Sequence, residues 1–268
     1  MCTLILGRDV LGPHTMLLGA NRDERPARPS IPPTVLIESP RVVGGKDRMA
    51  SGTWLAIREG RAAVALLNRR DRSAADPPLD RRSRGLLTLD VASTPEGAAP
   101  PARPETAAAE DGPARAALER ALESIARESY APLTLVHASP TACWMVAHDG
   151  ASTRVACIEP GWHVVTHREL DDPGEPRTAH LLARLRGNPP ASRAAAEVLL
   201  VELLRSHGGP GVPRTCLHEG IMVTVSSSLV WMDEGGASYR HAEGRPCEHE
   251  YEDRTPLLSG AALPGAGR

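Results

Sequence analysis

The sequence predicts an α+β fold, in which antiparallel sheets carry a few helices on their faces. Short apolar runs bounded by turn residues recur along most of the chain, which is typical of antiparallel strands. Helical segments interrupt them, so that the order is strands, two helices, strands, two helices, strands. Hydrophobic residues make up 41% of the 268 residues and aromatic residues only 3%, so small aliphatic side chains must fill the core.

The strands are read from apolar runs that end at Gly, Pro, Asn or Asp. The predicted strands are residues 2–6, 15–19, 35–37, 52–57, 62–67, 133–137, 142–148, 153–157, 162–166, 221–232 and 237–241. The first two form a hairpin that turns at Gly12 and Pro13 and brings Cys2 and residues 21–24 to one end of a sheet. Residues 44–47 are expected to form a turn.

Helices are predicted where apolar residues recur with helical spacing or where the composition favours helix. The predicted helices are residues 83–92, 114–129, 177–186 and 192–206. Ser83 is a suitable N-cap, and the Gly208-Gly209-Pro210 run ends the last helix. The Pro-rich segment 25–40 cannot sustain a helix and is expected to be extended.

A length of 268 residues is compatible with one large domain or two small ones. Residues 93–113 are dense in Ala, Pro and Glu, which is typical of a mobile loop or an insertion. The Pro- and Gly-rich tail 255–268 is expected to be disordered. We therefore expect one domain over residues 1–254.

Composition excludes several classes of function. The net charge is −2 without a basic block, which argues against nucleic-acid binding. No apolar run approaches the roughly 18 residues of a membrane span, and the N-terminus lacks the basic start of a signal peptide. The five cysteines are widely spaced with no CxxC, so we expect a reducing compartment, the cytoplasm, and neither a metal site nor a cofactor.

Cys2 is the leading candidate for chemistry. Cysteine is small enough for the initiator methionine normally to be removed, which would expose Cys2 as the first residue. Its α-amine, with a pKa near roughly 8, could then act as the base for its own thiol, with a pKa of about 8.5. The alternative is that Cys2 is a small hydrophobic residue at the start of a strand.

Several short motifs occur in a fixed order and together resemble the NRDE family, also called the transport and Golgi organisation protein two family. The resemblance runs from residue 1 to about 253 and is densest over residues 1–90. The motifs are Met1-Cys2-Thr3-Leu4, Asn21-Arg22-Asp23-Glu24, Gly45-Lys46-Asp47, Gly52-Thr53-Trp54-Leu55, Leu67-Asn68, Ser83-Arg84-Gly85 and Cys216-Leu217-His218.

The resemblance implies a four-layer αββα sandwich of the N-terminal nucleophile hydrolase type. The nearest enzymes by this resemblance are the penicillin V acylase and bile-salt hydrolase group, which cleave amides with an N-terminal cysteine. By analogy, Cys2 would be the nucleophile, Asp23 would bond its α-amine, and Asn68 would donate to the oxyanion. Arg22 would support Asp23 or bind a substrate carboxylate. Candidate substrate-binding residues are Asn21, Glu24, Trp54 and His167.

The chain departs from the family pattern at two positions. His167 stands where the family usually has an asparagine, and Val225 where it tends to have an arginine. Two hypotheses follow: a hydrolase of an amide, thioester or related acyl bond in a small-molecule substrate, or a non-catalytic binder of acyl-CoA, lipid or heme. The candidates also have structural interpretations, in which Asn68 caps a turn, Trp54 is a core residue and His167 a loop histidine.

Overall fold

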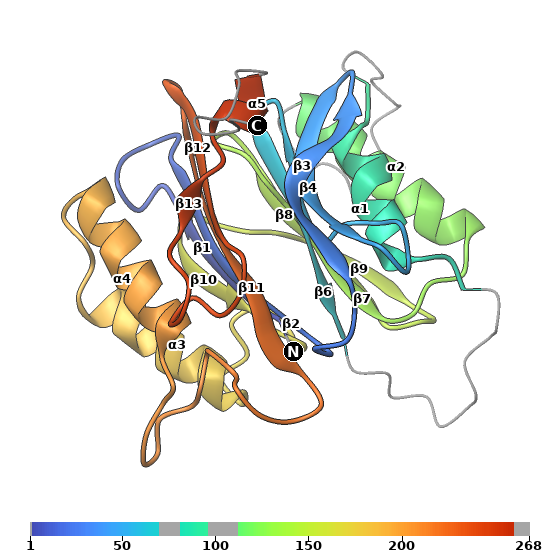
Figure 1. Cartoon of the computed structure of the whole chain (residues 1–268). Helices are drawn as coiled ribbons and strands as arrows, with labels where there is room; N and C mark the ends of the chain where they lie inside the picture. The colour runs from blue at the N-terminus through green and yellow to red at the C-terminus, as the bar shows by residue number, and fades with distance from the viewer. Residues whose placement is uncertain (1, 70–80, 96–111, 260–268) are drawn as a thin grey trace, which may run out of the picture. The chain divides into compact units, whose positions relative to one another are not determined.

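The computed structural model describes residues 2–69, 81–95 and 112–259 (Figure 1). The chain divides into two compact units. Unit 1 comprises Met1–Arg28 and Pro160–Thr255, and unit 2 comprises Pro29–Glu159 and Pro256–Arg268. None of the helices within the described ranges is long and apolar enough to cross a bilayer.

Unit 1 is built on a six-stranded antiparallel sheet in which β2 lies between β1 and β11. In sheet order the strands are β10 (Gly161–Val165), β1 (Thr3–Arg8), β2 (Met16–Glu24), β11 (Val223–Asp233), β12 (Gly236–Ala242) and β13 (Glu252–Asp253). Helices α3 (Pro176–Gly187) and α4 (Arg193–Arg205) cover one face of this sheet (Figure 1). Their leucines pack on alternate sheet residues, among them Ile5, Leu17, Val164 and Leu229.

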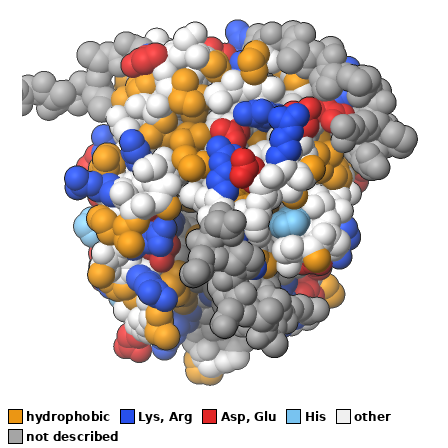
Figure 2. Space-filling model, turned by 90° about the vertical axis from the view of Figure 1, so that its right-hand side faces the viewer, with side chains coloured by type: hydrophobic (Ala, Val, Ile, Leu, Met, Phe, Trp, Pro, Cys, Tyr) orange, Lys and Arg blue, Asp and Glu red, His pale blue; other side chains and the backbone are white. Residues whose placement is uncertain are grey.

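Unit 2 is built on a seven-stranded sheet in which the strands follow one another in sequence order. The strands are β3 (Ser30–Glu38), β4 (Arg41–Asp47), β5 (Leu55–Arg58), β6 (Ala62–Asn68), β7 (Leu133–Ala138), β8 (Cys143–His148) and β9 (Thr153–Cys157). Helices α1 (Arg84–Ala92) and α2 (Gly112–Arg127) pack against one face, and Trp144 donates from Nε1 to the Ala114 carbonyl at 2.9 Å. On the face drawn in Figure 2, acidic and basic side chains lie beside one another.

The prediction of an α+β fold with antiparallel sheets is confirmed. The expected turn at residues 44–47 is wrong, because these residues belong to β4. The two glycines of β4 instead let neighbouring atoms lie close to its backbone. A β-carbon on Gly44 would lie 2.3 Å from the Leu55 carbonyl oxygen, and one on Gly45 would lie 2.3 Å from the Trp54 ring. Ser83 occupies the N-cap of α1 but makes no side-chain cap hydrogen bond.

The segments expected to be mobile are only partly described. Residues 96–111 of the expected loop and residues 260–268 of the expected tail lie outside the described ranges. The first residues of the tail are ordered. Pro256–Ser259 form the short helix α5, and Arg41 Nε donates to the Leu257 carbonyl at 2.7 Å. The single domain expected over residues 1–254 stays a prediction.

Two of the sequence motifs meet where β5 and α1 begin. Thr53 N donates to the Gly85 carbonyl at 3.1 Å, and a β-carbon on Gly52 would lie 2.2 Å from the carbonyl carbon of Gly85. The backbones therefore approach more closely than any side chain would allow. This contact gives the Gly-Thr-Trp-Leu and Ser-Arg-Gly motifs a packing role within unit 2.

Replacing Gly52 tests this close approach. We expect Gly52→Ala to lower the free energy of unfolding by about 1–3 kcal/mol, because backbone atoms cannot yield as a flexible side chain would. Gly112→Ala is the matched control: a β-carbon there meets nothing within 4 Å, and alanine favours the first turn of α2. Urea unfolding measures both, and equal stability of the two variants would contradict the packing role.

Candidate active site at the start of the first strand

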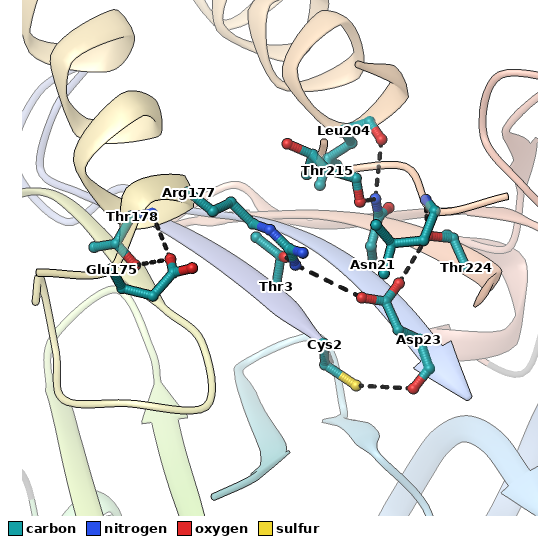
Figure 3. Close-up of polar contacts among 11 residues, drawn as sticks. Cys2, Thr3, Asn21, Asp23, Glu175, Arg177, Thr178, Leu204, Thr215 and Thr224 are labelled. Carbon is teal, nitrogen blue, oxygen red and sulfur yellow. Dashed lines mark hydrogen bonds and ion pairs between the residues drawn. The ribbon is translucent and has the colours of Figure 1, made fainter. Parts of the chain in front are cut away.

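Cys2 lies immediately before β1 and is half-buried. Its thiol donates to the main-chain carbonyl of Asp23 across the β1–β2 pair, with an Sγ–O distance of 3.8 Å (Figure 3). Burial raises the pKa of the Cys2 thiol above its ordinary value, and the Asp23 carboxylate raises it further. The sulfur is therefore a neutral thiol near pH 7 unless a neighbouring base takes its proton.

Asp23 places a fully buried carboxylate near the end of β2. Thr224 Oγ1 donates to Asp23 Oδ1 at 2.7 Å, and Arg177 Nη1 lies 3.7 Å from Oδ2 (Figure 3). Burial raises the pKa of Asp23, while the hydrogen bond from Thr224 and the charge of Arg177 act in the opposite direction. The carboxylate thus has a neutral partner from β11 and a cationic partner from α3.

Arg177, like Thr224, is a partner of Asp23 that the sequence did not indicate. It lies in the first turn of α3, where Pro176 takes the first helical position and Glu175 caps the helix by accepting from Thr178 N at 2.7 Å. The Arg177 guanidinium also donates to Thr3 Oγ1 at 2.8 Å. The sequence signals a helix start here, but nothing in it indicates which strand the first turn faces.

Asn21 lies on the same face of β2 as Asp23, because side chains alternate along a strand. Its amide nitrogen donates to the Leu204 carbonyl at 2.9 Å and to the Thr215 carbonyl at 3.1 Å (Figure 3). The side chain thereby ties β2 to the end of α4 and to the segment that leads into β11. Asn21 has a supporting position in the site.

Arg22 and Glu24 point to the other face of β2. Arg22 is buried and stands opposite Ser226 in β11, one residue beyond a bulge at Val225. Its positive charge opposes the burial that raises the pKa of the Cys2 thiol. Glu24 is engaged locally, accepting from Arg25 N at 2.9 Å and lying 3.6 Å from Arg28 Nε.

The remaining candidates lie elsewhere in the chain. His167 is buried just beyond the end of β10 in unit 1. Trp54 and Asn68 belong to unit 2, where the Trp54 ring covers Gly45 and Asn68 is the exposed last residue of β6. Within unit 1 the structure therefore joins Cys2 with the β2 residues, and it adds Thr224 and Arg177 to them.

Solved structures with a similar fold are N-terminal nucleophile hydrolases. Conjugated bile acid hydrolase from Clostridium perfringens superposes with a TM-score of 0.58 at 12% identity, covering 98% of this chain and 95% of that chain. The Caenorhabditis elegans ortholog of N-acylethanolamine-hydrolyzing acid amidase superposes with a TM-score of 0.53 at 14% sequence identity, covering 85% of this chain and 92% of that chain. Penicillin V acylase from Agrobacterium tumefaciens superposes with a TM-score of 0.50 at 11% sequence identity, covering 91% of this chain and 83% of that chain. The chain has the N-terminal nucleophile hydrolase fold.

The sequence itself defines the family. The profile of the Transport and Golgi organisation 2 family matches residues 1–181, and the chain belongs to that family. A search of curated protein sequences finds no match. The resemblance inferred from the short motifs is confirmed.

The bond from Thr224 to Asp23 can be tested by stability. Thr224 Oγ1 also accepts from Leu217 N at 2.9 Å, so Thr224→Val removes both hydrogen bonds while nearly keeping the shape. We expect Thr224→Val to lower the free energy of unfolding by about 1–3 kcal/mol, because buried polar groups lose their partner. Thr224→Ser keeps the hydroxyl and is the control in urea unfolding. A loss of stability in Thr224→Ser alone, with Thr224→Val as stable as the unaltered chain, would show that the methyl group matters and the hydrogen bonds do not.

Proposed function

We propose that the protein is an N-terminal-cysteine hydrolase that cleaves an amide, thioester or related acyl bond. The observation that carries the proposal is the Cys2 thiol beside Asp23, whose buried carboxylate is held by Thr224 and Arg177. Burying a carboxylate is costly, and ionisable groups with perturbed pKa values cluster at functional sites. The fold shared with an amidase, a bile acid hydrolase and an acylase supports the same class of reaction.

Before the reaction, removal of Met1 frees the α-amine of Cys2. The amine takes the thiol proton, and the thiolate attacks the acyl carbon to form a carbon–sulfur bond. Collapse of the tetrahedral oxyanion breaks the acyl bond, and the leaving amine or thiol takes the proton from the ammonium. Water then attacks the thioester with the amine as base, which releases the acid and restores the Cys2 thiol.

The other residues have supporting roles in this proposal. Asp23 orients the α-amine, and Arg22 favours the thiolate or binds a substrate carboxylate, for which its planar fork is suited. The family resemblance assigns Asn68 the role of oxyanion donor, a contribution worth roughly 3–4 kcal/mol per donor in known enzymes. Asn21 holds β2 in place, while Glu24, Trp54 and His167 are assigned to substrate binding.

The substrate class follows from the chemistry: a small molecule with an acyl group joined to nitrogen or sulfur. The thiol must stay reduced to act, and none of the five cysteines, all of which lie in the described ranges, forms a disulfide. The proposal therefore places the protein in a reducing compartment, the cytoplasm.

Processing can be tested by the pH dependence of alkylation. In the chain without Met1, we expect iodoacetamide to label Cys2 with a midpoint below about 8, because the free amine favours the thiolate. Inserting a lysine between Met1 and Cys2 prevents methionine removal and blocks the amine. In that chain the midpoint should exceed about 8.5, because burial raises the pKa of the thiol.

Mass spectrometry of the N-terminal peptide measures the rate of Cys2 alkylation in the processed chain and in the chain with the inserted lysine. Alkylation of Cys157 in the same molecules is the internal reference. An aldehyde probe, which condenses with an amine and thiol on one residue, should react with the processed chain alone. Met1 retained in the purified protein, or equal midpoints in the two chains, would contradict self-activation. Cys2→Ala should abolish turnover of acyl substrates; ligand binding without turnover in the unaltered chain would favour a carrier of acyl-CoA, lipid or heme.

Asp23→Asn separates function from stability. We expect acyl-probe labelling of Cys2 to fall about 10²–10⁴-fold, because the amine loses the group that orients it. The folded pKa of Asp23 is raised, so the carboxyl stabilises the fold below its unfolded pKa, and this contribution is lost as pH rises through the folded pKa. At neutral pH the asparagine variant should therefore be at least as stable as the unaltered chain.

Urea unfolding between acid and neutral pH measures the free energy of unfolding of Asp23→Asn and of the unaltered chain. The stability of the variant relative to the unaltered chain should increase as pH rises. Glu234→Gln, which removes a carboxylate that is 82% exposed, is the control and should show no such trend. A variant destabilised at every pH, with labelling unchanged, would assign Asp23 a purely structural role.

A further inference from the structure

Four sulfur and nitrogen side chains from separate segments converge in unit 1. His207 follows α4, Cys216 and His218 lie on the segment before β11, and Cys247 follows β12. Their ligand atoms all lie within 4.8 Å of one another. Cys216 is buried and the other three are accessible to differing degrees, so the cluster lies at the edge of the unit.

Four of the distances among these atoms are close to the edges of a tetrahedral zinc site. Zinc–sulfur bonds of about 2.3 Å and zinc–nitrogen bonds of about 2.0–2.1 Å give tetrahedral edges of about 3.8 Å for S–S, 3.3 Å for N–N and 3.6 Å for S–N. Here Cys216 Sγ and Cys247 Sγ are 3.5 Å apart, and His207 Nε2 and His218 Nε2 are 3.1 Å apart. His218 Nε2 lies 3.1 Å from Cys247 Sγ and 3.9 Å from Cys216 Sγ.

Hydrogen bonding alone does not account for this convergence. His218 Nε2 faces one nitrogen and two sulfurs at once. A neutral ring nitrogen carries either one proton or one lone pair, so it can serve only one of these neighbours at a time. A cation at the centre would accept lone pairs from all four groups together.

We propose that His207, Cys216, His218 and Cys247 bind a structural zinc ion. Two thiolates and two imidazoles in a tetrahedral arrangement select zinc over magnesium or calcium, which prefer oxygen ligands. Glu248 supports His218 from outside: its Oε1 lies 3.5 Å from His218 Nδ1, and its Oε2 accepts from Arg245 Nη1 at 2.9 Å. A carboxylate on the far nitrogen of a histidine ligand fixes the orientation of the ring.

The ion would hold the segment that supports the candidate active site. Leu217, between two of the ligands, exchanges hydrogen bonds with Thr224: Thr224 N donates to the Leu217 carbonyl at 2.9 Å, and Leu217 N donates to Thr224 Oγ1 at 2.9 Å. Thr224 in turn donates to Asp23. The link to catalysis rests on the proposed function, whereas zinc binding does not.

The expectation of no metal site came from the absence of CxxC in the sequence. That argument considers ligands close together in the chain, and only Cys216 and His218 are. The other two arrive from 9 residues before Cys216 and 29 residues after His218, by the numbering of the chain. Folding brings them together because the β11–β12 hairpin returns Cys247 to the end of α4.

The test is the metal content of the untagged full-length chain, purified under reducing conditions. We expect about one zinc per chain by plasma mass spectrometry. Cobalt exchanged for zinc should show thiolate-to-cobalt charge-transfer bands and the strong visible bands of a tetrahedral site. Cys247→Ser should lose the metal and these bands, whereas Cys157→Ser, a free cysteine in unit 2, should keep both.

Further variants keep the proposal testable if Cys247→Ser fails to fold. Glu248→Gln should weaken zinc binding by about 10–100-fold, while Glu250→Gln, a neighbouring exposed carboxylate, should not. Cys2→Ala should keep the zinc, so a failed hydrolase assay leaves this result independent. A folded, reduced chain that takes up neither zinc nor cobalt would overturn the proposal, and so would a Cys216–Cys247 disulfide in the purified protein.

Discussion

The buried carboxylate of Asp23 is the feature around which the candidate site of unit 1 is arranged. An isolated carboxylate inside a protein costs several kcal/mol, so the fold must supply partners for it. Thr224 supplies a hydroxyl from β11, and Arg177 supplies a positive charge from α3. Arg177 is itself fixed by Thr3, the residue next to Cys2, so the carboxylate, its counter-charge and the start of β1 form one connected group.

The central position of β2 makes this group possible. Strand β2 pairs with β1 as far as Asn21 on one side and with β11 as far as Glu24 on the other, so that Cys2 and Thr224 both lie beside its end. Alternation along the strand then separates the two charges, with Asp23 facing the helices and Arg22 the opposite face. The Cys2 thiol at the strand start thus has a carboxylate near one face of the strand and a guanidinium near the other.

Strand periodicity and the position of the Asn-Arg-Asp-Glu run were enough to predict the β1–β2 hairpin and the proximity of Cys2 to Asp23 along one sheet end. Arg177 and Thr224 could not be predicted, because they depend on the pairing of segments about 150 to 200 residues apart, which local pattern does not determine. The glycine pair at 44–45 was misread for a related reason: a turn and a close approach both require glycine, and only the packed neighbour distinguishes them.

The departure at Val225 takes on a different meaning in the structure. Val225 sits at the bulge of β11, between Thr224, which pairs with Asp23, and Ser226, which pairs with Arg22. The bulge lets both neighbours stay in register with β2 while the residue between them has no partner on that strand. Positive charge still reaches both faces of the strand end, from Arg177 on α3 and from Arg22 on β2. A valine at this position therefore leaves the buried carboxylate with its counter-charge, and the loss of an arginine from the family pattern does not by itself argue against catalysis.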